Sequence, residues 1–211
     1  MKGKLVVAVL LLCVFFLSPV KASAGFVSTF DSGIEGWQVY LGPALLFTNP
    51  IYNSEGNISY SRPDSFPWTF SQLSWNDWSS LYGGTISFDI FVTGEGLYNN
   101  NMQTVFIDLP GPVGTYFYSN FEVTPLKNTW TTYQIQILDS NFINVDPSGG
   151  TLSSLLKDVR GLDIRGDLLQ GIETVYIDNV RVSPVPEPGT LILLGAGIIG
   201  LAGYGRKKFT K

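Results

Sequence analysis

The last 28 residues constrain the fold of this chain most, because they combine a proline-rich stretch, an apolar run and a basic end in that order. Prolines cluster at 184–188, residues 189–205 carry no charge, and residues 206–211 are basic. Seventeen helical residues span roughly 25 Å, close to the shortest length that crosses a bilayer core. Because Lys and Arg stay cytoplasmic, the pattern predicts a transmembrane helix over 189–205 with a cytoplasmic tail. The alternative is a buried hairpin of a soluble domain.

This segment resembles the PEP-CTERM sorting signal of Gram-negative bacteria. The matching residues are Val185, Pro186, Glu187, Pro188 and Gly189 before the apolar run, and Arg206, Lys207 and Lys208 after it. The resemblance implies recognition by an exosortase-type processing enzyme and cleavage near the Pro-Glu-Pro. It also implies attachment to the inner membrane before processing, and delivery to the cell surface or the extracellular matrix of bacteria that make exopolysaccharide.

The N-terminus has the pattern of a secretory signal peptide. Two lysines and 13 apolar residues (5–17) precede Ala22 and Ala24, which supply the small-residue cleavage pattern. We therefore expect the mature chain to begin at Gly25. The expected organisation is a signal peptide at 1–24, one domain at 25–183 and the sorting segment at 184–211.

Composition excludes several kinds of site from the mature domain. The only cysteine, Cys13, lies in the signal peptide, and the chain has no histidine. A disulfide and a Ser-His-Asp or Cys-His catalytic centre are therefore excluded, and a zinc site is disfavoured. Residues 25–183 hold six Lys and Arg against 16 Asp and Glu, a net charge of about −10. A domain so acidic repels the nucleic acid backbone, so we expect no nucleic acid partner.

The domain is mostly β-structure in its sequence pattern. Short aromatic and β-branched runs alternate with Gly, Pro, Asn, Asp and Ser clusters, and residues 85–92 alternate between apolar and polar except at Phe91. One helix is expected at 152–159, where leucines recur at helical spacing after Thr151, a possible N-cap. Residues 62–80, rich in Pro, Ser and Trp, are expected to form a long surface loop. This pattern predicts an all-β fold, an antiparallel β-sandwich with one short helix.

Two parts of the domain carry a second resemblance. Residues 30–37 (Phe-Asp-Ser-Gly-Ile-Glu-Gly-Trp) look like the opening of many carbohydrate-binding jelly rolls. Residues 78–89, in which Tyr82-Gly-Gly precedes a strand, are similar to laminin B domains, and the segments at 130–138, 155–156, 162–165 and 178–182 keep that family's order. The resemblance implies a galactose-binding-like jelly roll, a fold that is non-enzymatic in most of its uses.

Three carboxylates are the candidates for a structural calcium site: Asp31, Glu35 and Asp178. Calcium takes several oxygen ligands from carboxylates and backbone carbonyls. In folds of this type the first and last strands are neighbours, which would bring the Asp31 loop near Asp178. The alternative is that Asp178 faces solvent or caps a turn with Asn179.

Four aromatic residues are the candidates for a ligand-binding surface: Trp68, Trp75, Trp78 and Tyr82. Exposed aromatic rings with a polar group suit surfaces that are partly in contact with water, and they could stack on the apolar faces of sugar rings. The alternative is that most of these rings fill the core, because large aromatic side chains are highly buried on average.

Together these patterns predict an exported, non-catalytic surface or matrix protein that binds or organises extracellular polysaccharide in a biofilm. One alternative is a structural coat or adhesion protein that binds protein partners. A weaker one is a polysaccharide-cleaving enzyme. The 16 acidic residues do not discriminate, because some pair of them is bound to have the carboxylate spacing of a glycosidase.

Overall fold

The computed structural model describes residues 25–42, 46–62, 67–99, 103–109, 116–119, 124–145, 150–185, 195 and 197–198. The predicted signal peptide and nearly all of the predicted transmembrane helix and sorting motif lie outside these residues. Within the described ranges, no helix is both long and apolar enough to span a membrane.

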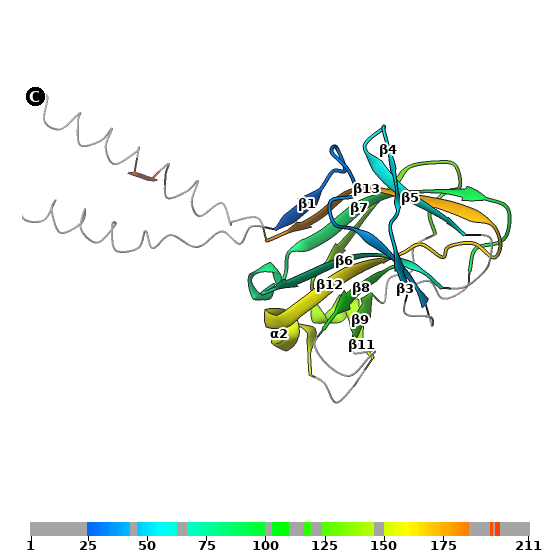
Figure 1. Ribbon diagram of the computed structural model, residues 1–211. Helices are drawn as coiled ribbons and strands as arrows, with labels where there is room; N and C mark the ends of the chain where they lie inside the picture. Colours follow the sequence, from blue (N-terminus) through cyan, green and yellow to red (C-terminus); the bar gives the residue numbers. More distant parts are fainter. Residues whose placement is uncertain are drawn as a thin grey trace, which may run out of the picture.

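Two antiparallel sheets form the domain (Figure 1). The six-stranded sheet has the order β10 (Thr131–Gln136), β7 (Thr85–Gly94), β13 (Glu173–Ser183), β5 (Asn57–Arg62), β4 (Ile51–Asn53), and β1 (Phe26–Ser28) also pairs with β13. The seven-stranded sheet has the order β11 (Phe142–Asn144), β9 (Tyr116–Ser119), β8 (Val105–Asp108), β12 (Val159–Arg165), β6 (Thr69–Asn76), β2 (Gln38–Leu41), β3 (Leu46–Thr48). The predicted all-β antiparallel sandwich, a jelly roll with one short helix, is therefore confirmed.

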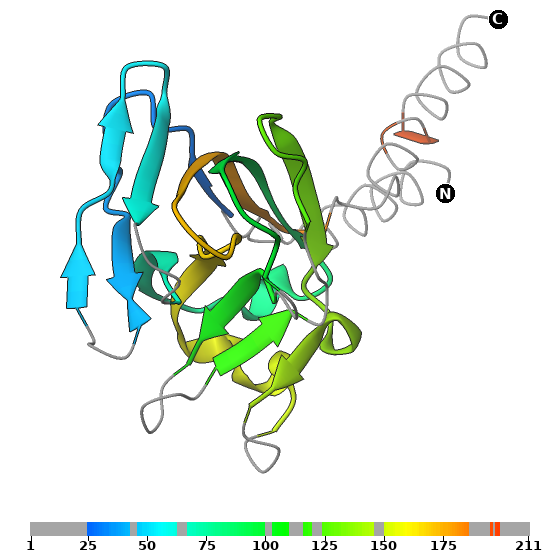
Figure 2. The ribbon, with the colours of Figure 1, turned by 90° about the vertical axis from the view of Figure 1, so that its right-hand side faces the viewer.

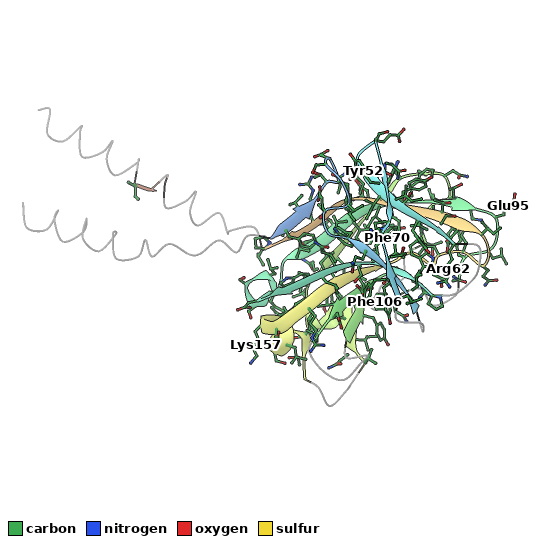
Figure 3. All side chains as sticks on the ribbon, in the orientation of Figure 1. Tyr52, Arg62, Phe70, Glu95, Phe106 and Lys157 are labelled. Carbon is green, nitrogen blue, oxygen red and sulfur yellow. The ribbon has the colours of Figure 1, made fainter. Side chains whose placement is uncertain are left out.

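The core lies between the two sheets because each long strand alternates inward apolar residues with outward polar ones. In β7 the inward set is Ile86, Phe88, Ile90 and Val92, all buried. Figure 3 labels Phe70, on β6, which is buried between the sheets, and Phe106, on β8, a strand of the seven-stranded sheet. Each sheet consequently presents one outer face that the core does not use.

The predicted surface loop at 62–80 is wrong, because β6 occupies its second half and lies inside the seven-stranded sheet between β12 and β2. Phe70 enters the core while Ser71 and Leu73 lie on the other face. The prolines and serines before Thr69 are typical of a loop, so the sequence pattern did not predict this strand. Residues 63–66 lie outside the described part of the chain. Figure 2 shows the β4–β5 hairpin, in cyan, at one side of the molecule.

The predicted helix is confirmed but is shorter than expected. α2 covers Leu152–Leu155 and a 3-10 turn, η4, follows at Leu156–Asp158 before β12 begins at Val159. The side chain of Thr151 makes no capping hydrogen bond. Asp139 takes this role instead, since its carboxylate accepts hydrogen bonds from the N–H and the hydroxyl of Ser153 at 3.1 and 3.0 Å.

Candidate functional site

Two of the four predicted ligand-binding aromatics are core residues. Trp68 is 1% exposed and Trp78 is 3% exposed. The ring of Trp68 packs between Tyr60 and Phe70, at centroid distances of 5.0 and 5.2 Å. The prediction that Trp68 and Trp78 stack on a sugar is therefore wrong, and the alternative, that they fill the core, holds for both.

The other two aromatics have different outcomes. Tyr82 is 36% exposed and donates a hydrogen bond to Asp139 at 2.9 Å, so its ring is fixed at the end of the 3-10 turn η2 (Ser79–Leu81). The side chain of Trp75 lies outside the described part of the structure. A ligand role for Trp75 and Tyr82 stays a prediction.

The predicted calcium ligands share one region, but they do not form a coordination shell. Burial raises the pKa of Asp178, and repulsion from Asp89, Asp31 and Glu35 raises it further, so these four carboxylates are electrostatic neighbours. Within the described ranges no three acidic residues are placed to hold one metal ion. The Asp178 carboxylate accepts hydrogen bonds from the N–H and the amide of Asn179. Calcium binding by Asp31, Glu35 and Asp178 stays a prediction.

A second surface, on the outer face of the seven-stranded sheet, combines aromatic and polar side chains. Strand register sets Tyr118, Phe106, Asp163, Ser71 and Gln38 side by side across β9, β8, β12, β6 and β2. A parallel row, two residues along the strands, is Arg165, Thr69, Tyr40 and Phe47. We call these nine residues, together with Asp108, the β12 face.

The aromatic side chains of the β12 face are accessible. Phe47 is 47% exposed, while Tyr40, Phe106 and Tyr118 are half-buried. The rings of Tyr40 and Phe47 lie 5.2 Å apart at an angle of 44°. The face therefore offers rings on both sides of a polar centre.

The polar centre of the β12 face is acidic and partly desolvated. Burial raises the pKa of Asp163 to about 7, a hydrogen bond with Ser71 opposes this, and repulsion from Asp108 adds to it. Burial also raises the pKa of Asp108, against a hydrogen bond from the Leu109 N–H and the attraction of Arg160. Carboxyl groups so placed can accept a hydrogen bond when ionised and donate one when protonated.

Arg165 supplies the positive charge of the β12 face, and its neighbours hold it in place. Its Nη2 lies 3.2 Å from the Asp167 carboxylate, and its Nε donates to the Asp167 carbonyl at 3.0 Å. Asn99 also donates to the Asp167 carboxylate, at 3.1 Å. Because two bonds orient the guanidinium, its remaining N–H groups have a fixed direction.

Sequence reasoning missed the β12 face. In the sequence, residues 162–165 stand out only as a segment that keeps the order of laminin B domains, and Tyr40 and Phe106 belong to no motif. The available signal was the alternation of Leu162 and Ile164 with charged residues, which places a carboxylate and a guanidinium on the outward side of a strand.

Comparison with known proteins identifies the C-terminal segment and the fold. Residues 184–207 match the PEP-CTERM protein-sorting motif. This motif implies an exosortase-sorted surface protein that is exported and anchored in the membrane by its C-terminus before processing. A comparison of the whole sequence with curated proteins gave no match.

Among solved structures, the chain is similar to the L4b domain of human laminin alpha-2, with a TM-score of 0.56, 11% identity, and coverage of 70% of this chain and 90% of that one. It is also similar to the family 11 carbohydrate-binding module of a Clostridium thermocellum cellulosomal cellulase, with a TM-score of 0.53, 17% identity and coverage of 78% and 97%. That module has also been solved with a β-1,3-1,4-mixed-linked tetrasaccharide (TM-score 0.53, 18% identity, coverage 77% and 98%). At these identities the likeness concerns the fold.

Proposed function

We propose that this protein is an exported surface protein of a Gram-negative bacterium that binds a polysaccharide on its β12 face without cleaving it. The observation that carries the proposal is the row of register partners in which Asp163 and Ser71 lie between the aromatic residues Phe106 and Tyr118 and the amide of Gln38. The sorting motif supports the location, since it implies delivery to the cell surface.

The chemistry of a sugar suits the β12 face. A pyranose ring has an apolar face that stacks on an aromatic ring and a rim of hydroxyl groups that pair with carboxylates, amides and guanidinium groups. Tyr40 and Phe47 form one platform, and Phe106 lies across the polar centre, next to Asp163. Several sugar units can therefore contact rings while their hydroxyls reach Asp163 and Arg165.

The similar folds support the ligand class. The family 11 module is named as carbohydrate-binding and has been solved with a bound tetrasaccharide. An accessible row of aromatic and polar side chains across one sheet of that fold can contact several units of an extended chain. We infer that the natural ligand is a polysaccharide of the extracellular matrix, and that an exosortase-type enzyme is the processing partner.

The test is glycan binding by the full chain, expressed with its own signal sequence and purified in a mild detergent. The probes are a mixed-linked glucan tetrasaccharide and a panel of purified exopolysaccharides. We expect Tyr40→Ala and Phe106→Ala each to weaken binding about tenfold or more, because each removes a stacking ring. Tyr82→Ala removes an exposed ring at η2, where the sequence predicts a ligand site, and it should leave binding unchanged if the β12 face is the binding site.

Three outcomes would contradict the proposal. Loss of binding only in Tyr82→Ala would move the site to the loop that follows β6. New reducing ends released from the glycans would make the protein an enzyme. A folded chain that binds no glycan would favour the structural coat or adhesion protein that binds protein partners.

A further inference from the structure

The outer face of the six-stranded sheet carries an aromatic row of its own. Tyr176 on β13 lies opposite Phe91 on β7, with ring centroids 5.6 Å apart at 80°. Trp130, directly before β10, lies 5.6 Å from Phe91 at 45°. Trp130 is 45% exposed and the other two rings are half-buried. These rings point away from the core, which the alternate residues of β7 and β13 already fill.

A pair of carboxylates lies beside this row. Asp89 and Asp178 are register partners two residues from Phe91 and Tyr176 on the same two strands, so they share the face, about 7 Å further along the strands. The Asn179 amide donates to Asp89 at 2.9 Å, and the Thr132 hydroxyl donates to the other Asp89 oxygen at 2.5 Å. Each carboxylate oxygen can accept a further hydrogen bond. The two carboxylates are thus held in place and can each accept hydrogen bonds from a ligand.

The charge around the pair is mostly negative. Asp31 and Glu35 also repel the Asp178 carboxylate. Arg181, opposite Ser87, is the basic residue of the following row on this face. A cation that bound beside Asp89 and Asp178 would relieve this repulsion, and an aromatic face attracts a cation as well. An acidic polymer would be repelled.

We propose that this aromatic row and the Asp89–Asp178 pair form a second binding site, for the ammonium groups of an amino-sugar polymer. The rings of Trp130, Phe91 and Tyr176 stack on the sugar units, and the two carboxylates accept hydrogen bonds from an ammonium group. The inference deepens the proposed function and rests on it for the ligand class. Because the β12 face lies on the other sheet, one domain can then bridge two polysaccharide chains.

The test uses the full chain in detergent with a glucosamine tetrasaccharide, its N-acetylated counterpart and the mixed-linked glucan tetrasaccharide, with chelator present to exclude metal-mediated binding. We expect the glucosamine probe to bind at least tenfold more tightly than its N-acetylated form, and to bind more weakly as salt rises. Trp130→Ala and Asp89→Asn with Asp178→Asn should each weaken glucosamine binding about tenfold and leave glucan binding unchanged. Phe106→Ala should do the opposite.

Thermal unfolding of each variant shows whether it is folded, and Trp130→Ala, which truncates an exposed ring, keeps the test valid if the carboxylate variant does not fold. Equal affinity for the two amino-sugar probes, or full glucosamine binding by folded Trp130→Ala, overturns the second site. If glucan binding still depends on Phe106 in that case, the proposed function survives without it. Absence of binding to every probe overturns both.

Discussion

Asp163 lies directly opposite Ser71, across β12 and β6, and its carboxyl group is hydrogen-bonded to the Ser71 side chain at the centre of the β12 face. This position removes the carboxyl from water on a face that otherwise meets solvent. The carboxyl therefore titrates near neutral pH, where an ordinary aspartate is fully ionised. Both stability and ligand binding should respond to that proton.

The first prediction concerns stability against pH. Burial raises the pKa of Asp163 to about 7, from 3.8 in an unfolded chain, so the folded state holds more protons between these values. The contribution of Asp163 to the free energy of unfolding is therefore complete below pH 3.8 and is lost as the pH rises through about 7. Asp163→Asn removes the titration, so the variant should gain stability relative to wild type as the pH rises from about 4 to about 7, measured by urea unfolding. A constant difference between the two proteins over this interval would contradict the prediction.

The second prediction concerns Glu173, which anchors the turn before β13. Its buried carboxylate accepts hydrogen bonds from the N–H groups of Leu168 and Leu169, at 3.1 and 2.8 Å. Glu173→Ala leaves both N–H groups buried without this partner, which costs about 1–3 kcal/mol for each group. We expect a loss of about 2–6 kcal/mol in the free energy of unfolding. Glu95→Ala, at an exposed position in a nearby turn, should change it by less than about 0.5 kcal/mol.

The sequence predicted the sandwich because the alternation of β7 depends only on which face of a strand meets the core. It failed around β6, where Trp68, directly before the strand, and Trp78, two residues after it, stand among prolines and serines and resemble an exposed aromatic loop. Burial of a ring depends on the opposite sheet, which local composition does not describe. The β12 face was missed for a related reason, since Asp163, Ser71 and Phe106 are far apart in the chain and only strand register brings them together.

The third prediction tests the core role of Trp68. A Cβ at Gly166 would lie far inside van der Waals contact with the Trp68 ring, and the Gly166 N–H donates to the Trp68 carbonyl at 3.0 Å. Gly166→Ala should therefore destabilise the protein by about 1–3 kcal/mol through overpacking. Combining it with Trp68→Leu should cost less than the two separate losses together, because the smaller side chain leaves room for the methyl group. Full additivity in thermal unfolding would show that the two positions do not touch.

The fourth prediction concerns calcium. If Asp31, Glu35 and Asp178 recruit calcium with backbone carbonyls, the expected affinity is in the range of about 10⁻⁴–10⁻³ M that is typical of extracellular modules. At 10 mM calcium a site of about 1 mM affinity stabilises the fold by about 1.4 kcal/mol, since the ion binds only the folded state. Calorimetric titration and thermal unfolding with calcium or chelator measure both quantities.

Asp178→Asn should abolish the calcium effect, while Asp77→Asn, at an exposed site beside η2, should preserve it and serves as the control. Relief of the repulsion among Asp178, Asp89, Asp31 and Glu35 is the physical source of the expected gain. The same repulsion also falls in Asp178→Asn without any ion, so this variant should unfold at a higher temperature than wild type in chelator and show no further rise with calcium. A wild-type protein whose unfolding temperature is the same in calcium and in chelator has no such site.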